Sequence, residues 1–302
     1  MSTSYHVAVI GLGAMGMGAA RSCLRAGLTT YGIDLSEQAR GQLQQAGAAA
    51  VMADARPLAE TLDAVLLLVV NAAQVRRILF GEEELARHLK PGTAIMVSST
   101  IAAEEASTLA AELAQLGLPM LDAPVSGGAI KADAGEMTVM AAGSDAAFDK
   151  LAPVLDAVAG KVYRVGKEPG QGSTVKIIHQ LLAGVHIAVA AEAMALASRA
   201  GVSLDLMYDV VTHAAGNSWM FENRMPRVLA GDYQARSAVD IFVKDLTLVA
   251  DTAKALRFPL PLASTALNMF LSASNAGHGQ EDDSAVIKTF SGITLPGQEE
   301  RP

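Results

Sequence analysis

The sequence has one cysteine, Cys23, and only 4% aromatic residues among 302 positions. A single cysteine excludes an intrachain disulfide framework and a cysteine-based metal site. We expect Cys23 to be a small packed side chain within the first helix. Basic residues are also scarce, since 23 Lys and Arg stand against 31 Asp and Glu for a net charge of -8. This balance argues against a nucleic-acid partner, because such a partner requires a basic face.

Long uninterrupted apolar runs are missing too. The run AVLLLVV, Ala64 to Val70, is too short to span a bilayer. The tract from Ile177 to Ala200 is longer, but histidines, a glutamine, a glutamate and an arginine interrupt it. The N-terminus has no basic segment followed by an apolar stretch and a cleavage site, as a signal peptide would. These absences predict a cytoplasmic protein with no membrane partner.

The first half of the chain alternates short β-rich runs with helical stretches. Such alternation predicts an α/β fold in which a Rossmann-type, doubly wound parallel sheet is covered on both faces. Near-continuous apolar character in Ala64–Val70 is typical of a strand buried on both sides. The predicted strands are Val7–Ile10, Thr29–Ile33, Ala64–Val70, Ala94–Ser98, Pro119–Leu121, Met137–Ala141 and, as the last strand, the first part of KVYRVGKEPGQG.

After KVYRVGKEPGQG, Lys161 to Gly172, β-rich runs nearly vanish and an all-helical C-terminal domain is expected. We place the domains at 1–164 and 165–302, joined by a long helix that starts near position 173. That helix is apolar nearly all round, which predicts burial on most sides, either between the two domains or in a subunit interface. We therefore expect a homo-oligomer, either a dimer or a tetramer. The predicted helices are Ser173–Ala200, Leu204–Ala215, Ala238–Leu256 and Pro261–Ala276.

The segment VAVIGLGAMGMGAA carries a G-x-G-x-x-G pattern between a predicted strand and a predicted helix. In a dinucleotide-binding loop, Gly11 permits the tight turn and Gly13 lets the pyrophosphate approach the backbone. Gly16 then lets the helix lie close to the sheet. The helix N-terminus presents N–H groups to the phosphates. The alternative is a glycine turn that binds nothing, and the ordered strand, helix and acid make it the weaker interpretation.

Asp34 closes the second strand about twenty residues after the glycines, where a ribose-binding acid is expected. Its carboxylate can accept hydrogen bonds from the adenosine ribose hydroxyls and would repel a 2′-phosphate. No arginine follows directly, since the next residue is Leu35. The sequence therefore predicts NAD as cofactor, with NADP disfavoured by Asp34.

A lone cation, Lys176, lies on the mostly apolar helix that follows Gly172. Burying a cation is costly unless it is paired, neutral or lines a cleft. Burial and a nearby positive nicotinamide both favour the neutral amine, which suits a general acid/base. Gln180 shares a helical face with Lys176, and His179 is three residues on. The alternative is a snorkelling lysine or a structural ion pair.

Small and hydroxyl-bearing residues follow two further predicted strands. Ser126 to Gly128 could expose successive backbone N–H groups as a carboxylate cradle, or could form an ordinary glycine turn. Ser98 to Thr100 end a strand where ligands bind in open parallel sheets, or they cap the next helix. Asn71 occupies an analogous strand end.

Weaker signals lie in the C-terminal half. Lys244 either reaches a cleft or sits on a solvated face, and Trp219, Phe221 and Asn223 either line a pocket or pack the helical core. We find no His, Asp and Glu spacing that requires a metal, and no Ser-His-Asp or Cys-His arrangement.

Four motifs in order give the chain a resemblance to the β-hydroxyacid dehydrogenase family, which includes 3-hydroxyisobutyrate dehydrogenase. They are G-L-G-x-M-G at Gly11–Gly16, D-A-P-V-S-G-G at Asp122–Gly128, G-S-T-V-K at Gly172–Lys176 and K-D-L at Lys244–Leu246. The resemblance covers nearly the whole chain. It implies an N-terminal NAD domain and a helical C-terminal domain, with the active site between them.

The resemblance also implies residue roles. It assigns catalysis to Lys176, and it predicts a small hydroxy acid as the partner molecule. Substrate contacts are expected from Ser126, Gly127, Gly128, His179 and Gln180. Cofactor contacts are expected from Gly11, Leu12, Gly13, Ala14, Met15, Gly16, Asp34, Leu35, Val70, Asn71, Thr100 and Lys244.

One departure bears on the substrate. The family usually has Asn four residues after the lysine, whereas this chain has Gln180 preceded by His179. Together with Asn217, these polar side chains suit a polyhydroxylated substrate, whose hydroxyls need partners when desolvated. Within the family, three stretches resemble members that oxidise L-threonate at C2 to 2-oxo-tetronate, and the resemblance implies this activity. The stretches are KIIHQLLAGVHIA, AAGNSWMFENRM and SAVDIFVKDL. Tartronate semialdehyde reduction, 3-hydroxyisobutyrate oxidation and a non-catalytic NAD-binding module are the alternatives.

Overall fold

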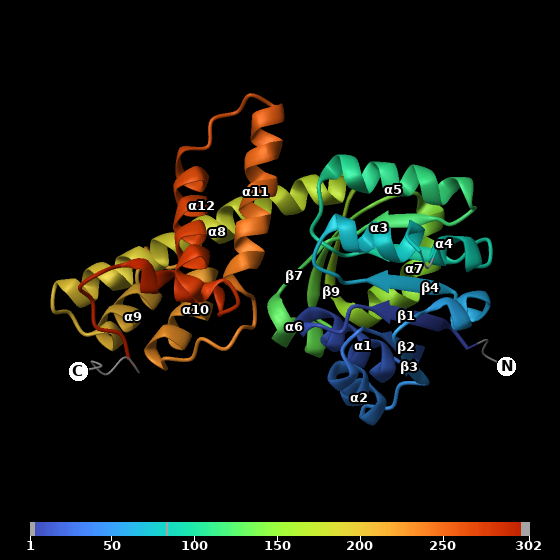
Figure 1. Ribbon diagram of the computed structural model, residues 1–302, viewed down its shortest axis with the longest axis horizontal. Coiled ribbons are helices and arrows are strands. Elements are labelled where there is room, and N and C mark those ends of the chain that lie inside the picture. Colours follow the sequence, from blue (N-terminus) through green and yellow to red (C-terminus); the bar gives the residue numbers. More distant parts are fainter. Residues whose placement is uncertain (1–3, 83, 297–302) are drawn as a thin grey trace. The chain divides into compact units, whose positions relative to one another are not determined.

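The computed structural model describes residues 4–82 and 84–296. The chain divides into two compact units, Met1–Lys176 and Ile177–Pro302. The first unit is built on one sheet with helices on both faces (Figure 1). Its strands are β1 (His6–Ile10), β2 (Thr29–Ile33), β3 (Ala50–Met52), β4 (Ala64–Leu67), β5 (Ala94–Val97), β6 (Met120–Asp122), β7 (Val125–Ser126), β8 (Met137–Ala142) and β9 (Ala159–Gly166).

The strand order is β3-β2-β1-β4-β5-β6-β8-β7, with β9 also paired to β8. All pairings from β3 to β6 are parallel, whereas β8 pairs antiparallel with β6 and β7. The expected doubly wound, mainly parallel sheet is therefore confirmed. Because β1 lies between β2 and β4, the glycine loop leaves the sheet where the strand order reverses, which is where such folds bind ligands.

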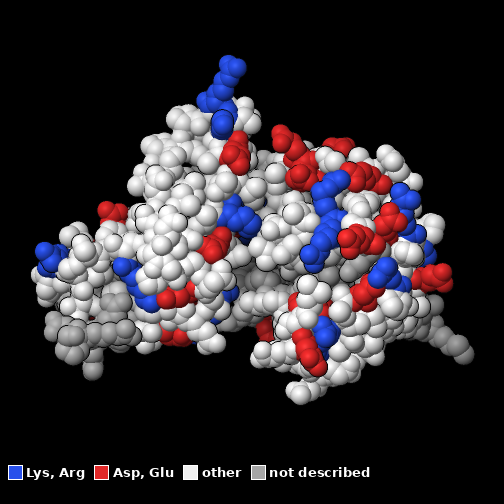
Figure 2. Space-filling view, viewed as in Figure 1, with Lys and Arg blue, Asp and Glu red and all other residues white. Residues whose placement is uncertain are grey.

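Helices cover the sheet on each side. They are α1 (Ala14–Arg25), α2 (Glu37–Gln45), α3 (Ala72–Phe80), α4 (Leu85–His88), α5 (Ala103–Gln115), α6 (Gly128–Ala134) and α7 (Asp145–Val158), with a 3₁₀ segment at Arg56–Thr61. Figure 2 shows acidic and basic side chains interspersed over this unit on the face in view, with no large area of one sign.

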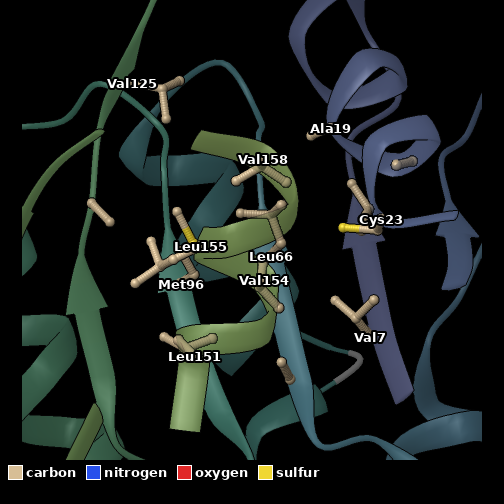
Figure 3. Packing of buried hydrophobic residues seen from close by; sticks show 14 of the residues in the cluster. Val7, Ala19, Cys23, Leu66, Met96, Val125, Leu151, Val154, Leu155 and Val158 are labelled. Carbon is tan, nitrogen blue, oxygen red and sulfur yellow. The ribbon is translucent and has the colours of Figure 1, made fainter. Parts of the chain in front are cut away.

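Side-chain alternation along the strands divides the core of this unit into two layers. Val7 and Leu66 pack with α1 and α7 on one face (Figure 3). Ala8 and Val65 pack with α3, α4 and α5 on the other. Cys23 of α1 is fully buried in the first layer, as expected. Burial raises the pKa of its thiol to about 12. A strand buried on both faces has no polar positions, which explains the continuous apolar run in β4.

Two strand predictions in this unit need correction. The run ending at Val70 is too long, because β4 ends at Leu67. Beyond it, the backbone N–H groups of Val69 and Val70 donate to the side chains of Ser99 and Gln74 instead of to a neighbouring strand. Two short strands, β3 and β7, are missing from the prediction because each has too few residues to show a period.

The second unit is helical. Its helices are α8 (Gln171–Arg199), which begins in the first unit, α9 (Leu204–Thr212), α10 (Trp219–Leu229), α11 (Val239–Ala255) and α12 (Pro261–Ala273). A π-helical turn at Ser274–His278 and a 3₁₀ segment at Asp283–Thr289 follow. The core lies among α8, α10, α11 and α12, and Phe242 stacks on Phe270 with ring centroids 5.2 Å apart.

The long helix α8 differs from its prediction on one side. It is long and apolar enough to cross a membrane by length and composition, but half of that window is buried inside the protein. A row of apolar side chains at Ile178, Leu182, Val189 and Leu196 is more than half exposed in the single chain. The expectation of burial on most sides is therefore not met by this chain alone.

Helix α10 is missing from the sequence prediction. Its local signal is Ser218, whose hydroxyl accepts a hydrogen bond from Phe221 N–H as an N-cap. Pro226 lies inside the helix and argues against a helical interpretation of the sequence. Buried ion pairs hold α10 in place, since Arg224 and Arg227 bind Asp283 and Asp282, which are both fully buried.

Candidate active site

The glycine loop leaves β1 through positions where no side chain fits. Gly11 has φ +91°, and a Cβ there would lie 2.6 Å from the carbonyl oxygen of Leu68. A Cβ on Gly16 would lie 1.7 Å from the carbonyl oxygen of Gly11. A Cβ on Gly13, in contrast, would meet nothing within 4 Å. Gly11 and Gly16 are thus required by the fold, whereas Gly13 leaves open space that a ligand can use.

The N-terminus of α1 faces that open space without a side-chain cap. Gly13 is the N-cap residue and makes no side-chain cap hydrogen bond, since it has no side chain. The first-turn N–H groups and the positive end of the helix dipole are a suitable partner for a pyrophosphate. This arrangement fits a dinucleotide.

Asp34 follows β2 and is tied to the glycine loop. Its Oδ2 accepts a hydrogen bond of 2.7 Å from Leu12 N–H, and its Oδ1 accepts one of 2.8 Å from Ser36 N–H. Arg40 donates to the backbone carbonyls of Asp34 and Leu35. These bonds fix the direction of the carboxylate while its remaining lone pairs can still accept from ribose hydroxyls.

A cavity of about 320 Å³ lies beside this carboxylate, within the first unit. It is the size of a small-molecule site. Apolar side chains form most of its wall, and Asp34, Gln74 and Arg77 contribute polar groups. Its lining includes Gly11, Gly13, Leu35 and Val70 among the predicted cofactor residues. The open space at Gly13, the α1 N-terminus and this cavity together fit the adenosine and pyrophosphate parts of NAD.

The polar residues at the ends of β4 and β5 have structural partners. Ser98 Oγ donates to the Ala123 carbonyl, and Ser99 Oγ accepts from Val69 N–H. Asn71 Oδ1 accepts from Gln74 N–H and caps α3. The helix-cap alternative for Ser98 to Thr100 is wrong, because the N-cap of α5 is Ala102 and makes no side-chain bond. Thr100 is half-buried at this edge.

The turn after β7 needs both of its glycines. Gly127 has φ +134° and Gly128 has φ +72°, conformations that side chains disfavour. A Cβ on Gly127 would also lie 2.8 Å from Lys131 Cβ, whereas a Cβ on Gly128 would meet nothing within 4 Å. The backbone is therefore open at Gly128, next to the half-buried Ser126.

Asp122, which the sequence analysis assigned no role of its own, anchors the start of α8. Its Oδ2 accepts from Gly170 N–H at 2.7 Å and Ser173 N–H at 2.8 Å, and its Oδ1 accepts from Ser173 Oγ at 2.7 Å. Asp122 is fully buried. Burial raises the pKa of this carboxyl above its ordinary value, and the hydrogen bonds from Ser173 and Gly170 oppose that rise. Gly172 belongs to the same junction, since a Cβ there would lie 2.4 Å from the Asp122 carbonyl oxygen.

Lys176 lies one turn beyond this anchor on α8 and is only 6% exposed. The alternative of a lysine that extends its amine into solvent is therefore wrong for Lys176. Gln180, one further turn on, is 7% exposed, and His179 beside it is half-buried. In the second unit, Gln180 contacts Asp245 of α11, whose neighbour Lys244 is half-buried.

The aromatic and amide side chains of the second unit that the sequence offers as weaker candidates have different surroundings. Phe221 is buried in the helical core, and Asn223 Oδ1 accepts from Arg224 and Arg227 within the ion-pair network. Trp219 is half exposed at the start of α10. Asn217 Oδ1 is buried and has no hydrogen-bond partner in the part of the chain that the structure describes.

Comparison with known proteins places this geometry in a family. Residues 6–166 match the model of the NAD binding domain of 6-phosphogluconate dehydrogenase. Residues 170–290 match that of the NAD-binding region of NADP-dependent 3-hydroxyisobutyrate dehydrogenase. The loop, sheet and helical unit thus define a dinucleotide-dependent oxidoreductase. The chain belongs to the NAD-dependent β-hydroxyacid dehydrogenase family, as its motifs predict.

Individual relatives are similar over nearly the full chain. L-threonate dehydrogenase of Escherichia coli O6:H1 is 72% identical over 98% of each chain. L-threonate dehydrogenase of Cupriavidus necator is 55% identical over 98% of this chain and 100% of its own. A crystal structure of 3-hydroxyisobutyrate dehydrogenase from Salmonella typhimurium has 70% identity and a TM-score of 0.92. The match covers 95% of this chain and 100% of that chain.

Proposed function

We propose that this protein oxidises the C2 hydroxyl of L-threonate to 2-oxo-tetronate with NAD as acceptor. The observation that carries the proposal is the similarity to proteins named L-threonate dehydrogenase, at 55–72% identity over nearly the whole chain. The buried Lys176, held one turn beyond the Asp122 anchor, supports a proton-transfer role that such an oxidation requires.

NAD would lie along the glycine loop and the cavity beside Asp34, and it supplies the hydride acceptor when bound. Gly11 to Gly16 would hold the pyrophosphate, and Asp34 with Leu35 the adenosine ribose. Val70, Asn71, Thr100 and Lys244 are the proposed contacts toward the nicotinamide. Asp34 carries a negative charge where NADP has its 2′-phosphate, so NAD is the favoured form.

The substrate carboxylate would bind at Ser126, Gly127 and Gly128, where two positive-φ glycines leave the backbone open. The neutral amine of Lys176 accepts the proton of the C2 hydroxyl. The C2 hydrogen leaves with its bonding pair as hydride, and the C2–O bond becomes a carbonyl. Burial of Lys176 disfavours its charged form and so favours a base at this position.

Gln180 and His179 are the proposed contacts for the other substrate hydroxyls. They lie four and three residues beyond Lys176 on α8, on the side of the helix that carries the lysine. We further propose a cytoplasmic homo-oligomer without a nucleic-acid or membrane partner. The exposed apolar row on α8 supports an oligomer, and the interspersed surface charges in Figure 2 give no support to nucleic-acid binding.

The test is NADH formation with L-threonate, D-threonate, D-erythronate, D-glycerate and 3-hydroxyisobutyrate. A clear preference for L-threonate supports the proposal. A preference for 3-hydroxyisobutyrate, the substrate after which the Salmonella protein is named, would contradict the substrate while keeping the role of Lys176. Bound NAD without turnover of any of the five acids would favour a non-catalytic module.

A further inference from the structure

Four polar side chains from two helices of the second unit form one continuous chain of contacts. His179 Nδ1 lies 2.9 Å from Gln180 Oε1 on α8. Gln180 Nε2 donates to Asp245 Oδ2 on α11 at 2.5 Å. Asp245 Oδ1 lies 2.8 Å from Lys244 Nζ. We call this set, His179, Gln180, Asp245 and Lys244, the α8–α11 relay.

The middle of the relay, Gln180 and Asp245, is buried because the two helices approach closely beside it. A Cβ on Gly184 of α8 would lie 2.8 Å from the side chain of Leu246 on α11. Gln180 lies one turn before Gly184 and is 7% exposed. Asp245 directly precedes Leu246 and is 2% exposed. A carboxylate buried this deeply needs compensation for its charge, and Asp245 has one hydrogen bond from Gln180 and an ion pair with Lys244.

The chemistry of the Asp245 carboxylate sets the direction of both hydrogen bonds in the relay. An ionised carboxylate can only accept, so the NH₂ end of Gln180 must face Asp245. The carbonyl end of Gln180 then faces His179. A carbonyl oxygen can also only accept, so His179 Nδ1 must carry a proton. When the imidazole is neutral, its Nε2 is therefore an acceptor.

We infer that Asp245 is a positioning residue that fixes His179 as the Nδ1–H tautomer, so that Nε2 accepts a hydrogen bond from a substrate hydroxyl beyond C2. This inference rests on the proposed function. His179 is three residues from Lys176, which places their Cβ atoms about 5–6 Å apart on one helix. An acceptor on the residue that neighbours the proposed base favours a substrate that carries further hydroxyl donors beside C2.

The tautomer can be measured without turnover. Long-range ¹H–¹⁵N correlation spectra of the labelled full-length protein report which ring nitrogen carries the proton, and His179→Gln identifies the His179 signals. We expect Nδ1–H in the wild type at a pH where His179 is neutral. Gln180→Leu removes the carbonyl acceptor and Asp245→Asn no longer forces one amide orientation, so both should populate the Nε2–H form. Asp251→Asn, an exposed change on α11, is the matched control and should leave the wild-type pattern.

Kinetics tests the consequence for substrate choice. We compare L-threonate with its analogues that lack the C3 or the C4 hydroxyl. The wild type should prefer L-threonate over at least one analogue by about ten-fold in kcat/KM, the effect of one hydrogen bond. Asp245→Asn should lose most of that preference through KM, with kcat changed less, whereas Asp251→Asn should keep it.

The outcomes separate the two proposals. A wild type that does not oxidise L-threonate overturns the proposed function. An active wild type with Nε2–H at His179, or an active Asp245→Asn variant with an unchanged tautomer and an unchanged hydroxyl preference, overturns the inference alone. Circular dichroism of each variant confirms that it is folded before either measurement is interpreted.

Discussion

Replacing Asp122 by Ala should loosen the start of α8 and thereby reduce catalysis. The change removes the partner of three hydrogen bonds, from Gly170 N–H, Ser173 N–H and Ser173 Oγ. The two backbone donors lie in a buried junction, so the loss leaves them without their acceptor. Lys176 lies three residues after Ser173 on the same helix, so its position depends on this junction.

The magnitude follows from those bonds. Each buried donor left unsatisfied costs about 1–3 kcal/mol, and relief of the buried charge of Asp122 offsets part of the sum. We therefore expect about 3 kcal/mol of lost stability in the first unit, which corresponds to a fall in Tm of about 6–12 °C for a unit of this size. Ser173→Ala removes only the hydroxyl bond and should cost about 1 kcal/mol.

The assay pairs thermal unfolding with kinetics. Asp122→Ala should lower kcat for L-threonate at a temperature where the variant is folded. NAD affinity should stay near the wild-type value, since the hydrogen bonds of the Asp34 side chain go to Leu12 and Ser36 and those of Asp122 to Gly170 and Ser173. Asp149→Ala, an exposed change in the same unit, is the control and should alter neither quantity. A folded Asp122→Ala variant with the wild-type Tm and kcat would refute the anchoring argument.

Three further predictions concern the same unit. Gly13→Ala should leave Tm nearly unchanged but weaken NAD binding in a fluorescence titration, because the new methyl group fills open space. Gly16→Ala should also lower Tm, because its Cβ clashes with the Gly11 carbonyl oxygen. Equal Tm values for the two variants would contradict this. Asp34→Ala should reduce the preference for NAD over NADP, measured as a ratio of kcat/KM, and an unchanged ratio would assign ribose recognition elsewhere. Because burial raises the folded-state pKa of Asp122, its contribution to stability is fully present below its unfolded pKa and is lost as pH rises through the folded value. In chemical unfolding, the free energy of unfolding of the wild type should accordingly rise relative to that of Asp122→Asn as pH falls. A difference between the two that does not change with pH would argue against the raised pKa.

Local patterns predicted those parts of the molecule that depend on local rules. The G-x-G-x-x-G loop with Asp34 predicted the fold of the first unit, because residues close together in the sequence determine the turn, the close helix packing and the strand period. Pro226 inside α10 and the brevity of β3 and β7 removed the local signal at those elements. Tertiary packing decides them instead.

The polar anchors could not be predicted, since they join residues far apart in the sequence. Asp122 meets Ser173 fifty-one positions later, and Gln180 meets Asp245 sixty-five positions later. The motifs D-A-P-V-S-G-G and K-D-L contain both acids, but a motif does not say which of its residues bind ligand and which hold the fold. That distinction required the hydrogen bonds themselves.

The most direct test of the central claim is the turnover of L-threonate by Lys176→Ala. Loss of the proton acceptor should lower kcat by about 10²–10⁴-fold, the usual contribution of general acid–base catalysis, while NAD binding stays nearly intact. Lys244→Ala is measured beside it, and we expect a smaller loss of kcat because Lys244 is proposed to contact the cofactor and not the proton in transfer. Wild-type turnover in Lys176→Ala would contradict the account, because no other residue is proposed to accept the C2 hydroxyl proton.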